Sequence, residues 1–198
     1  MSGRPVVVLP TGTANLASVL AAIRRLGAEP RIAADADAVR DAERVVLPGV
    51  GTFGAAMTGL RRAGLDAVIA MRVRAGRPTL AMCVGLQILF ERSEESPDTE
   101  GIAVFRGSVG TFPETVRVPQ FGWNRIEPEP GCRYLEAGHA YFANSYRVIE
   151  ARGCKVAHAE HGERFVAALE RDNVLACQFH PELSGRFGHE LIGRWLEG

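Results

Sequence analysis

The chain has 198 residues, and its 23 basic and 23 acidic side chains give a formal net charge of zero at pH 7. That length fits one domain covering residues 1–198, and a composition of 46% hydrophobic and 23% charged residues is typical of a soluble globular protein. The balanced charge gives no drive towards nucleic acid or an anionic membrane, and no apolar run reaches the roughly 20 residues of a membrane-spanning helix.

The first half of the chain alternates between short apolar strands and amphipathic helices. Its N-terminal residues lack the basic and apolar regions of a signal peptide, so we expect a cytoplasmic protein. Strands that alternate with helices predict βαβ units and a parallel sheet. Strands are expected at residues 6–9, 45–47 and 79–82, and helices at residues 15–26, 54–62, 65–74 and 84–91.

The second half of the chain is rich in strand-like segments. A polar, acidic loop at residues 93–101 precedes them, and a last helix is expected at residues 188–197. The final three strands form a meander with turns at residues 161–162 and 172–173. The sequence therefore predicts a three-layer α/β sandwich whose mostly parallel central sheet gains antiparallel strands. Those extended segments are residues 116–118, 123–127, 146–150, 155–159, 165–170 and 174–179.

Cys83 lies where the strand at residues 79–82 meets the following helix. Ala81 and Gly85 flank it at two-residue distance, and a tight turn of this kind needs small neighbours because it crowds the backbone. The turn lifts the side chain clear of the sheet, and the unpaired N–H groups at a helix N-terminus favour a thiolate. The pattern predicts a nucleophilic cysteine, with a buried structural cysteine as the alternative.

His180 and Glu182 form a candidate pair at the end of the last predicted strand. Pro181 favours an extended conformation for His180, and residues two apart in an extended chain point the same way. A cysteine nucleophile needs a base, and the base needs an acceptor on its other ring nitrogen. The pair could fill both roles for Cys83, although by itself it would read better as an exposed strand end.

A glycine-rich turn at residues 48–54 follows another strand. It lacks the glycine patterns of phosphate-binding loops, so we favour an oxyanion hole over phosphate binding, with a plain strand-to-helix turn as the alternative. Gly49 and Gly51 flank Val50, and glycine permits backbone angles that other residues resist. The peptide between Gly49 and Val50 could therefore rotate its N–H into the site and act as a switch.

The other three cysteines give no sign of a disulfide framework or a metal site. Cys132, Cys154 and Cys177 are widely spaced, and no CxxC pair occurs. Cys177 and His180 lie three apart, but no second pair completes a set of zinc ligands, so a buried cysteine in a strand is favoured. We expect neither a metal nor a cofactor.

The cysteine turn, the His-Pro-Glu segment and the glycine loop together resemble the class I (triad-type) glutamine amidotransferases, and the resemblance covers nearly the whole chain. It implies a flavodoxin-like α/β fold. Gly-Trp-Asn and Pro-Gly-Val-Gly narrow the resemblance, because relatives that serve anthranilate, aminodeoxychorismate or GMP synthesis usually lack both. The segments that resemble the glutaminase subunits of imidazole glycerol phosphate synthases are residues 48–53, 121–124, 141–146 and 178–182.

The resemblance implies a role for each matching residue. Cys83 would attack the carboxamide of L-glutamine. His180 would take the thiol proton and pass it to the departing ammonia, while Glu182 orients His180. The backbone N–H groups of Val50 and Val84 would hold the oxyanion. The residues implied to hold the glutamine substrate are Gly51, Gln87, Ser145 and Tyr146.

The resemblance also implies a protein partner. Asn15 and Trp123 would face a (β/α)8-barrel cyclase subunit, HisF-like, that forms a heterodimer with this chain and uses its ammonia in histidine biosynthesis. A core position is the alternative for Trp123, because tryptophan is often largely buried. We also expect this chain by itself to be a poor glutaminase that its partner activates, since ammonia released without an acceptor is wasted.

Three positions depart from the family's pattern. Residues 10–16 read PTGTANL where the family usually has Asp-Tyr-Gly-x-Gly-Asn-Leu, Ala81 replaces a usual glycine, and Leu183 replaces a frequent lysine. Residues 10–16 lie towards the partner, so the details of that interface are expected to differ. Leu183 lacks the charge of the usual lysine, so a charged contact to the partner is expected to be missing. None of them removes a triad residue.

Four alternative functions remain open from the sequence. Two are glutaminases of other pathways, serving anthranilate or aminodeoxychorismate synthesis or pyridoxal phosphate synthesis, and the Gly-Trp-Asn segment argues against both. A third is a stand-alone cysteine hydrolase or peptidase, which would be active without a partner. The fourth is a catalytically silent regulatory protein, against which the intact triad argues.

Overall fold

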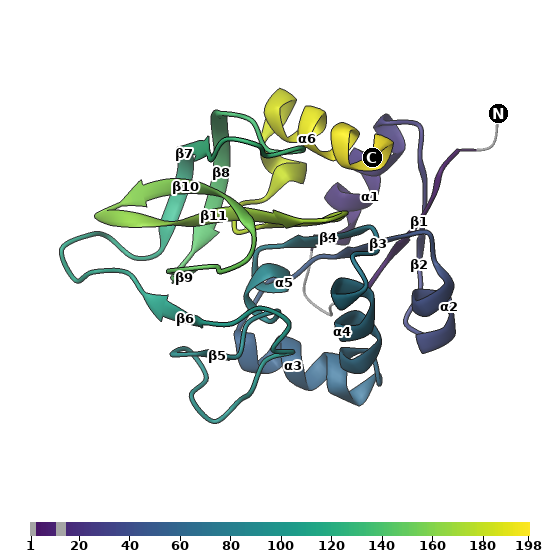
Figure 1. Cartoon of the computed structure of the whole chain (residues 1–198), viewed down its shortest axis with the longest axis horizontal. Coiled ribbons are helices and arrows are strands. Elements are labelled where there is room, and N and C mark those ends of the chain that lie inside the picture. Colours follow the sequence, from purple (N-terminus) through teal and green to yellow (C-terminus); the bar gives the residue numbers. More distant parts are fainter. Residues whose placement is uncertain (1–2, 11–14) are drawn as a thin grey trace.

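A computed structural model describes residues 3–10 and 15–198 (Figure 1). The strands are β1 Pro5–Val8, β2 Glu29–Ile32, β3 Arg44–Leu47, β4 Thr79–Met82, β5 Arg92–Ser93, β6 Ser108–Thr111, β7 Gln120–Pro128, β8 Gly138–Asn144, β9 Tyr146–Val148, β10 Lys155–His161, β11 Glu163–Arg171 and β12 Val174–Cys177. The helices are α1 Leu16–Arg25, α2 Ala36–Asp41, α3 Phe53–Arg62, α4 Asp66–Arg74, α5 Val84–Gln87, the 3₁₀ helix η1 Pro181–Leu183, and α6 Gly185–Glu197.

The sheet combines a parallel half with an antiparallel half. Its main path within the described residues runs β2-β1-β3-β4-β12-β11-β10-β7-β8. Strands β2, β1, β3, β4 and β12 pair in parallel, while β11, β10, β7 and β8 continue the sheet through antiparallel pairs. This confirms the predicted α/β sheet with antiparallel strands added late in the chain, including the meander of β10, β11 and β12.

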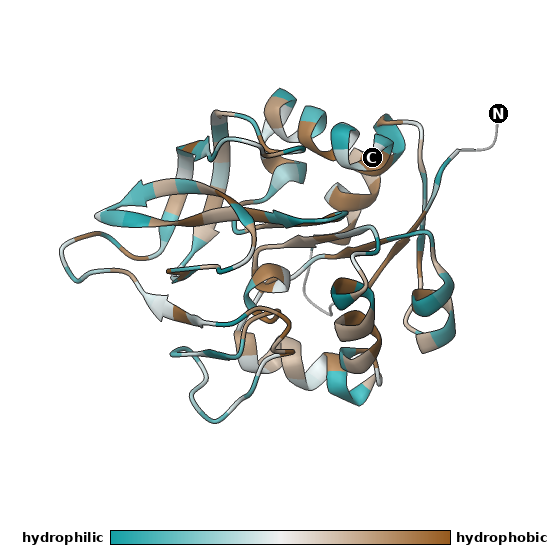
Figure 2. Cartoon of the chain, in the orientation of Figure 1, coloured by the Kyte–Doolittle hydropathy of each residue, from teal (hydrophilic) through white to brown (hydrophobic). Residues whose placement is uncertain are grey.

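Helices cover both faces of the parallel half, which gives three layers (Figure 1). Alternate residues of β1 point to opposite faces, so Val7 packs into the hydrophobic cluster with α3 and α4, and Val8 into the cluster with α1 and α6. Figure 2 shows hydrophobic residues concentrated on these central strands. Strands buried on both faces read as continuous apolar runs, which is why β3 and β4 are recognisable from the sequence.

Some elements differ from the sequence-based expectations. The strand expected at residues 116–118 is wrong, because Val116 ends a turn in which its N–H donates to the carbonyl of Pro113 and the next two residues are irregular. Helix α2 and strands β2, β5, β6 and β8 were not predicted. The β2 sequence, Glu-Pro-Arg-Ile, lacks an apolar pattern because it forms the edge of the sheet, where proline is tolerated. The helix expected at residues 84–91 ends at Gln87.

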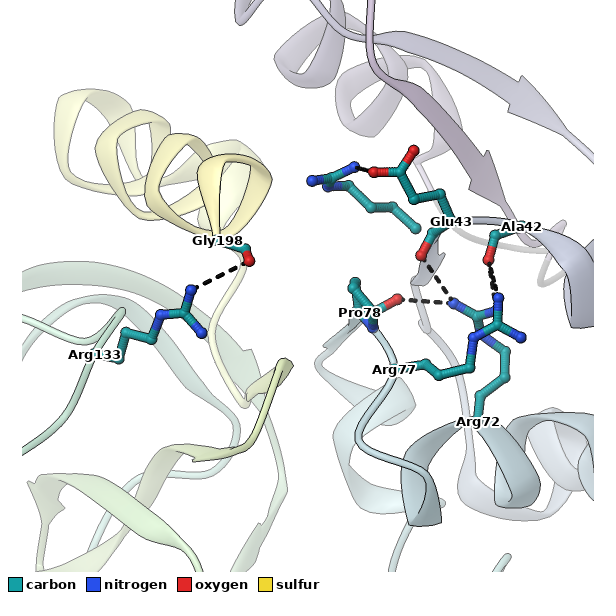
Figure 3. A network of polar contacts seen from close by, with 8 residues as sticks. Ala42, Glu43, Arg72, Arg77, Pro78, Arg133 and Gly198 are labelled. Carbon is teal, nitrogen blue, oxygen red and sulfur yellow. Dashed lines mark hydrogen bonds and ion pairs between the residues drawn. The ribbon is translucent and has the colours of Figure 1, made fainter.

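A buried arginine ties together the connections at the amino ends of β3 and β4 (Figure 3). Arg72 of α4 is 0% exposed, and its guanidinium donates to five backbone carbonyls, including those of Ala42 at 2.8 Å and Pro78 at 3.0 Å. Burial, with a smaller contribution from Arg77, lowers the pKa of Arg72 to about 10. Figure 3 also shows Arg133 donating to the carbonyl of Gly198 at the end of α6.

No helix among the residues that the structure describes is long and apolar enough to span a membrane.

The substitution Arg72→Met should lower the free energy of unfolding by about 3 kcal/mol, because it leaves several buried carbonyls without donors. Arg74→Met on the same helix is the matched control. Arg74 is exposed, so its replacement should change stability by less than about 0.5 kcal/mol. Urea denaturation of both variants measures the difference, and equal stabilities would contradict the role assigned to Arg72.

Candidate active site

Cys83 occupies a strained turn between β4 and α5. Its backbone has φ 52° and ψ −113°, in a region that residues with a side chain rarely adopt. The N–H of Cys83 donates to the carbonyl of Cys177 at 2.7 Å, which extends the pairing of β4 with β12. A Cβ atom on Gly85 would lie 2.2 Å from the carbonyl oxygen of Leu47, so this position needs glycine. The geometry matches the tight turn that the flanking small residues predicted.

The predicted oxyanion loop lies directly on this turn. A Cβ on Gly49 would be 2.4 Å from the backbone nitrogen of Gly85, and Gly51 has a positive φ of 87°. The N–H of Val84 has no hydrogen-bond partner in the described part of the chain. Helix α5 has only four residues, so its dipole is weaker than that of the longer helix expected from the sequence.

His180 and Glu182 contact one another through a turn rather than an extended chain. The Nδ1–H of His180 donates to Oε1 of Glu182 at 2.9 Å, and both side chains are buried. His180 itself is extended, but the following residues form the 3₁₀ helix η1. The prediction that the two side chains meet is therefore correct in geometry, while the extended conformation proposed for Glu182 is wrong, because η1 begins at Pro181.

The surroundings of His180 favour its charged form. Burial lowers the pKa of the imidazole, but the opposing contacts with Cys83 and Glu182 raise it to about 10. An imidazolium between a sulfur and a carboxylate is held by hydrogen bonds to both neighbours. At neutral pH the protonated ring can therefore donate a proton towards the sulfur of Cys83.

A cavity of about 250 Å³ collects the predicted residues around Cys83. Glu182 does not line it, because its carboxylate binds the other ring nitrogen of His180. This volume suits a small molecule that is mostly enclosed. The predicted residues that line the cavity are Val50, Gly51, Cys83, Val84, Gln87, Ser145, Tyr146 and His180.

The cavity also contains side chains that the sequence reasoning missed. Glu95 lines it, and its Oε2 accepts a hydrogen bond at 2.6 Å from the N–H of Phe53, at the start of α3. The segment was predicted as a polar loop, and its carboxylates were the available signal. Asn144 also lines the cavity, next to the predicted Ser145.

The two residues expected to face a partner lie outside the cavity. Trp123 is 58% exposed, so the core alternative is wrong, and its ring packs edge-on against Tyr141 with centroids 6.1 Å apart. Asn15 is exposed and caps α1, where its Oδ1 accepts from the N–H of Ser18 at 3.3 Å. Leu183, on η1, is 41% exposed. Residues 11–14 of the divergent loop lie outside the described residues.

The other three cysteines are poorly suited to nucleophilic chemistry. Burial, with a contribution from Glu170, raises the pKa of Cys132 to about 11, and burial raises the pKa of Cys154 to about 11. Burial holds the pKa of Cys177 well above its usual value. None of these three cysteines lines the cavity, whereas Cys83 does, so Cys83 stays the predicted nucleophile.

Similarity to known proteins identifies the family of this chain. The family model for class-I glutamine amidotransferases matches residues 8–196. The chain belongs to this family. A relative from Mycolicibacterium paratuberculosis named "Imidazole glycerol phosphate synthase subunit HisH" is 43% identical, with 100% of this chain and 99% of the relative covered. A relative of the same name from Methanopyrus kandleri is 39% identical, with 98% of each chain covered.

Solved structures show the same fold at lower sequence identity. A structure described as a glutamine amidotransferase has a TM-score of 0.77 at 22% identity and covers 97% of both chains. A structure of PurLQS from Thermotoga maritima has a TM-score of 0.72 at 18% identity, with 100% of this chain and 99% of that chain covered. The fold is therefore that of the class I amidotransferases.

The substitution Gly85→Ala should destabilise the protein by about 3 kcal/mol, because its methyl group would collide with the carbonyl of Leu47. Gly59→Ala, in the exposed middle of α3 with nothing near its added methyl group, should instead stabilise by about 0.5–1 kcal/mol. Denaturant unfolding compares the two variants. A Gly85→Ala protein as stable as the wild type would contradict the close approach.

His180 should remain protonated at pH 8 in the wild type, and Glu182→Gln should lower its pKa by removing a charge that raises it. Ring nitrogen NMR shifts report this, with His180→Asn identifying the signal. Because the pKa in the folded state exceeds the ordinary histidine value of 6.5, the stability that protonation contributes is complete below pH 6.5 and is lost as the pH rises towards 10. A neutral His180 at pH 8 would contradict this assignment.

Proposed function

We infer that this chain is the glutaminase subunit of an imidazole glycerol phosphate synthase. In that role it hydrolyses L-glutamine to glutamate and ammonia, and the ammonia passes to a (β/α)8-barrel cyclase subunit. Support comes from several relatives with this subunit name, which are 35–43% identical along nearly their whole length. The observation that carries the proposal is the cavity in which Cys83 and His180 meet the oxyanion loop.

The acylation step uses Cys83, His180 and Glu182 as a triad. The Cys83 thiolate attacks the carboxamide carbon of glutamine, and the carbonyl electron pair moves to oxygen, where the N–H groups of Val50 and Val84 stabilise it. As the intermediate collapses, the C–N bond breaks and His180 gives its proton to the nitrogen, which leaves as ammonia. Glu182 holds the ring in place throughout.

The deacylation step returns the site to its starting state. Neutral His180 takes a proton from a water molecule that attacks the γ-glutamyl thioester. The C–S bond then breaks, glutamate departs, and the thiolate and imidazolium are restored. The raised pKa of His180 supports this cycle, because the ring begins and ends it protonated.

Recognition of glutamine relies on polar groups around the cavity. Gly51, Gln87, Ser145 and Tyr146 line it and hold the substrate. The Glu95 carboxylate also lines it and is the group suited to bind the α-ammonium of an amino acid.

The proposed partner surface lies at the carboxyl edge of the parallel strands. Asn15 caps the start of α1, which follows β1, and so belongs to the same edge as Cys83 and His180. Phe121 and Trp123 are 71% and 58% exposed, and such aromatic side chains are typical anchors in protein interfaces. A heterodimer with the cyclase covers these residues and encloses a path along which ammonia passes to the cyclase.

Glutamine turnover should be low for the isolated chain and should rise by at least about 10²–10³-fold with the barrel partner loaded with its ribonucleotide ligand. That factor is the contribution of one oxyanion-hole donor. The proposed switch is a rotation of the peptide before Val50, which the bound partner favours. Ammonia release measures it, and Cys83→Ala is the control without activity. Full turnover by the isolated chain, unchanged by the loaded partner, would contradict the proposed coupling and favour a stand-alone hydrolase.

A further inference from the structure

Gln178 lies two residues before His180, and its side chain contacts both Cys83, the proposed nucleophile, and Gln87, which is proposed to bind the substrate. Its side chain is 0% exposed, and its backbone N–H donates to the carbonyl of Ala167 at 2.8 Å. Its Nε2 lies 3.9 Å from the sulfur of Cys83, and its Oε1 accepts a hydrogen bond at 3.0 Å from Nε2 of Gln87. Gln178 takes no part in the triad chemistry.

A backbone carbonyl fixes which atoms donate and which accept in the hydrogen bonds of the Gln87 and Gln178 side-chain amides. Nε2 of Gln87 also donates to the carbonyl of Tyr146 at 3.0 Å, and a carbonyl can only accept. Both hydrogens of the Gln87 amide are therefore used, one on Tyr146 and one on Gln178. The oxygen of Gln178 must then face Gln87, which leaves its NH2 group facing the sulfur of Cys83.

The same arrangement decides what Gln87 presents to a ligand. Gln87 is almost fully buried but lines the cavity, and its Oε1 has no hydrogen-bond partner among the described residues. Because Tyr146 and Gln178 bind its nitrogen, the Gln87 amide presents its oxygen, a hydrogen-bond acceptor, to the cavity. A ligand group that bears N–H donors is the chemical match, and glutamine carries such donors in its carboxamide and its ammonium group.

We propose that Gln178 is a positioning residue that locks the Gln87 amide with its oxygen towards the substrate and directs an N–H donor at the Cys83 sulfur. Its action on substrate binding rests on the proposed glutaminase function, whereas its action on the sulfur does not. A neutral N–H donor stabilises a thiolate without adding a charge, so the second effect concerns the reactivity of Cys83 towards any electrophile.

Two substitutions separate the two contacts. Gln178→Met keeps a similar length but removes both, so the Gln87 amide is no longer held and the KM for glutamine should rise about tenfold. Gln178→Glu keeps an oxygen for Gln87 but replaces the donor at the sulfur with a carboxylate. This variant should keep KM within about threefold while kcat falls at least tenfold, and alkylation of Cys83 should shift to higher pH.

The experiment measures glutamine hydrolysis with the barrel partner present, and iodoacetamide alkylation of Cys83 against pH by peptide mass spectrometry. Gln120→Met, which removes another buried glutamine, is the matched control and should leave KM and the alkylation profile unchanged. Melting temperatures separate loss of folding from loss of positioning. If Gln178→Met does not fold, the nearly isosteric Gln178→Glu still tests the contact with the sulfur.

A double variant tests whether Gln178 acts through Gln87. Gln178→Met should add little to the KM increase already caused by Gln87→Met, because the residues act as a unit. The proposal would be overturned if the KM effects of Gln178→Met and Gln87→Met multiplied in the double variant. It would also be overturned if a folded Gln178→Glu protein kept the wild-type alkylation profile. A wild-type complex without glutamine turnover would defeat the proposed function instead, and the alkylation profile would still decide the contact with the sulfur.

Discussion

Parallel pairing of β4 with β12 is the contact on which the candidate site depends. The two strands are far apart in the sequence, and their register sets Ala81 opposite Ala176 and Met82 opposite Cys177. The chain leaves both strands at the same edge of the sheet, so Cys83 and His180 emerge side by side. Both strands are fully buried, and a slip of one residue would turn their side chains to the wrong faces.

The oxyanion loop depends on the same pairing. Strand β3 is the other neighbour of β4, so the loop after β3 lies over the turn that holds Cys83. Gly49 and Gly85 allow the two backbones to touch, and a methyl group on either would force them apart. The proposed nucleophile, base and oxyanion loop thus follow three adjacent parallel strands, at the edge where α/β sheets place ligand sites.

Much of this arrangement was predictable because it follows from local patterns. The apolar runs identified β1, β3 and β4, and the small residues around Cys83 identified its turn. The exposure of Trp123 was also expected, although its place on a partner surface stays a prediction. Pro181 indicated the extended conformation of His180, but the turn of η1 that brings Glu182 to His180 needs tertiary packing.

What the sequence could not supply are contacts between distant polar residues. Glu95 comes from a loop whose carboxylates all look alike in sequence, and only the fold selects the one that reaches α3. Gln178 precedes His180 by two, which was a usable signal, yet its link to Gln87 depends on β12 lying beside α5. Edge strand β2 was missed because its stability comes from pairing with β1 rather than from burial.

Cys83 is the proposed nucleophile that attacks the side chain of glutamine. The most direct measurement is covalent labelling of the complex with a diazo-ketone analogue of glutamine, followed by peptide mass spectrometry. One label per chain should form on Cys83, glutamine should protect against labelling, and activity should be lost in proportion to the label. Labelling of Cys132, Cys154 or Cys177 with equal loss of activity, while Cys83 stays unmodified, would contradict this assignment.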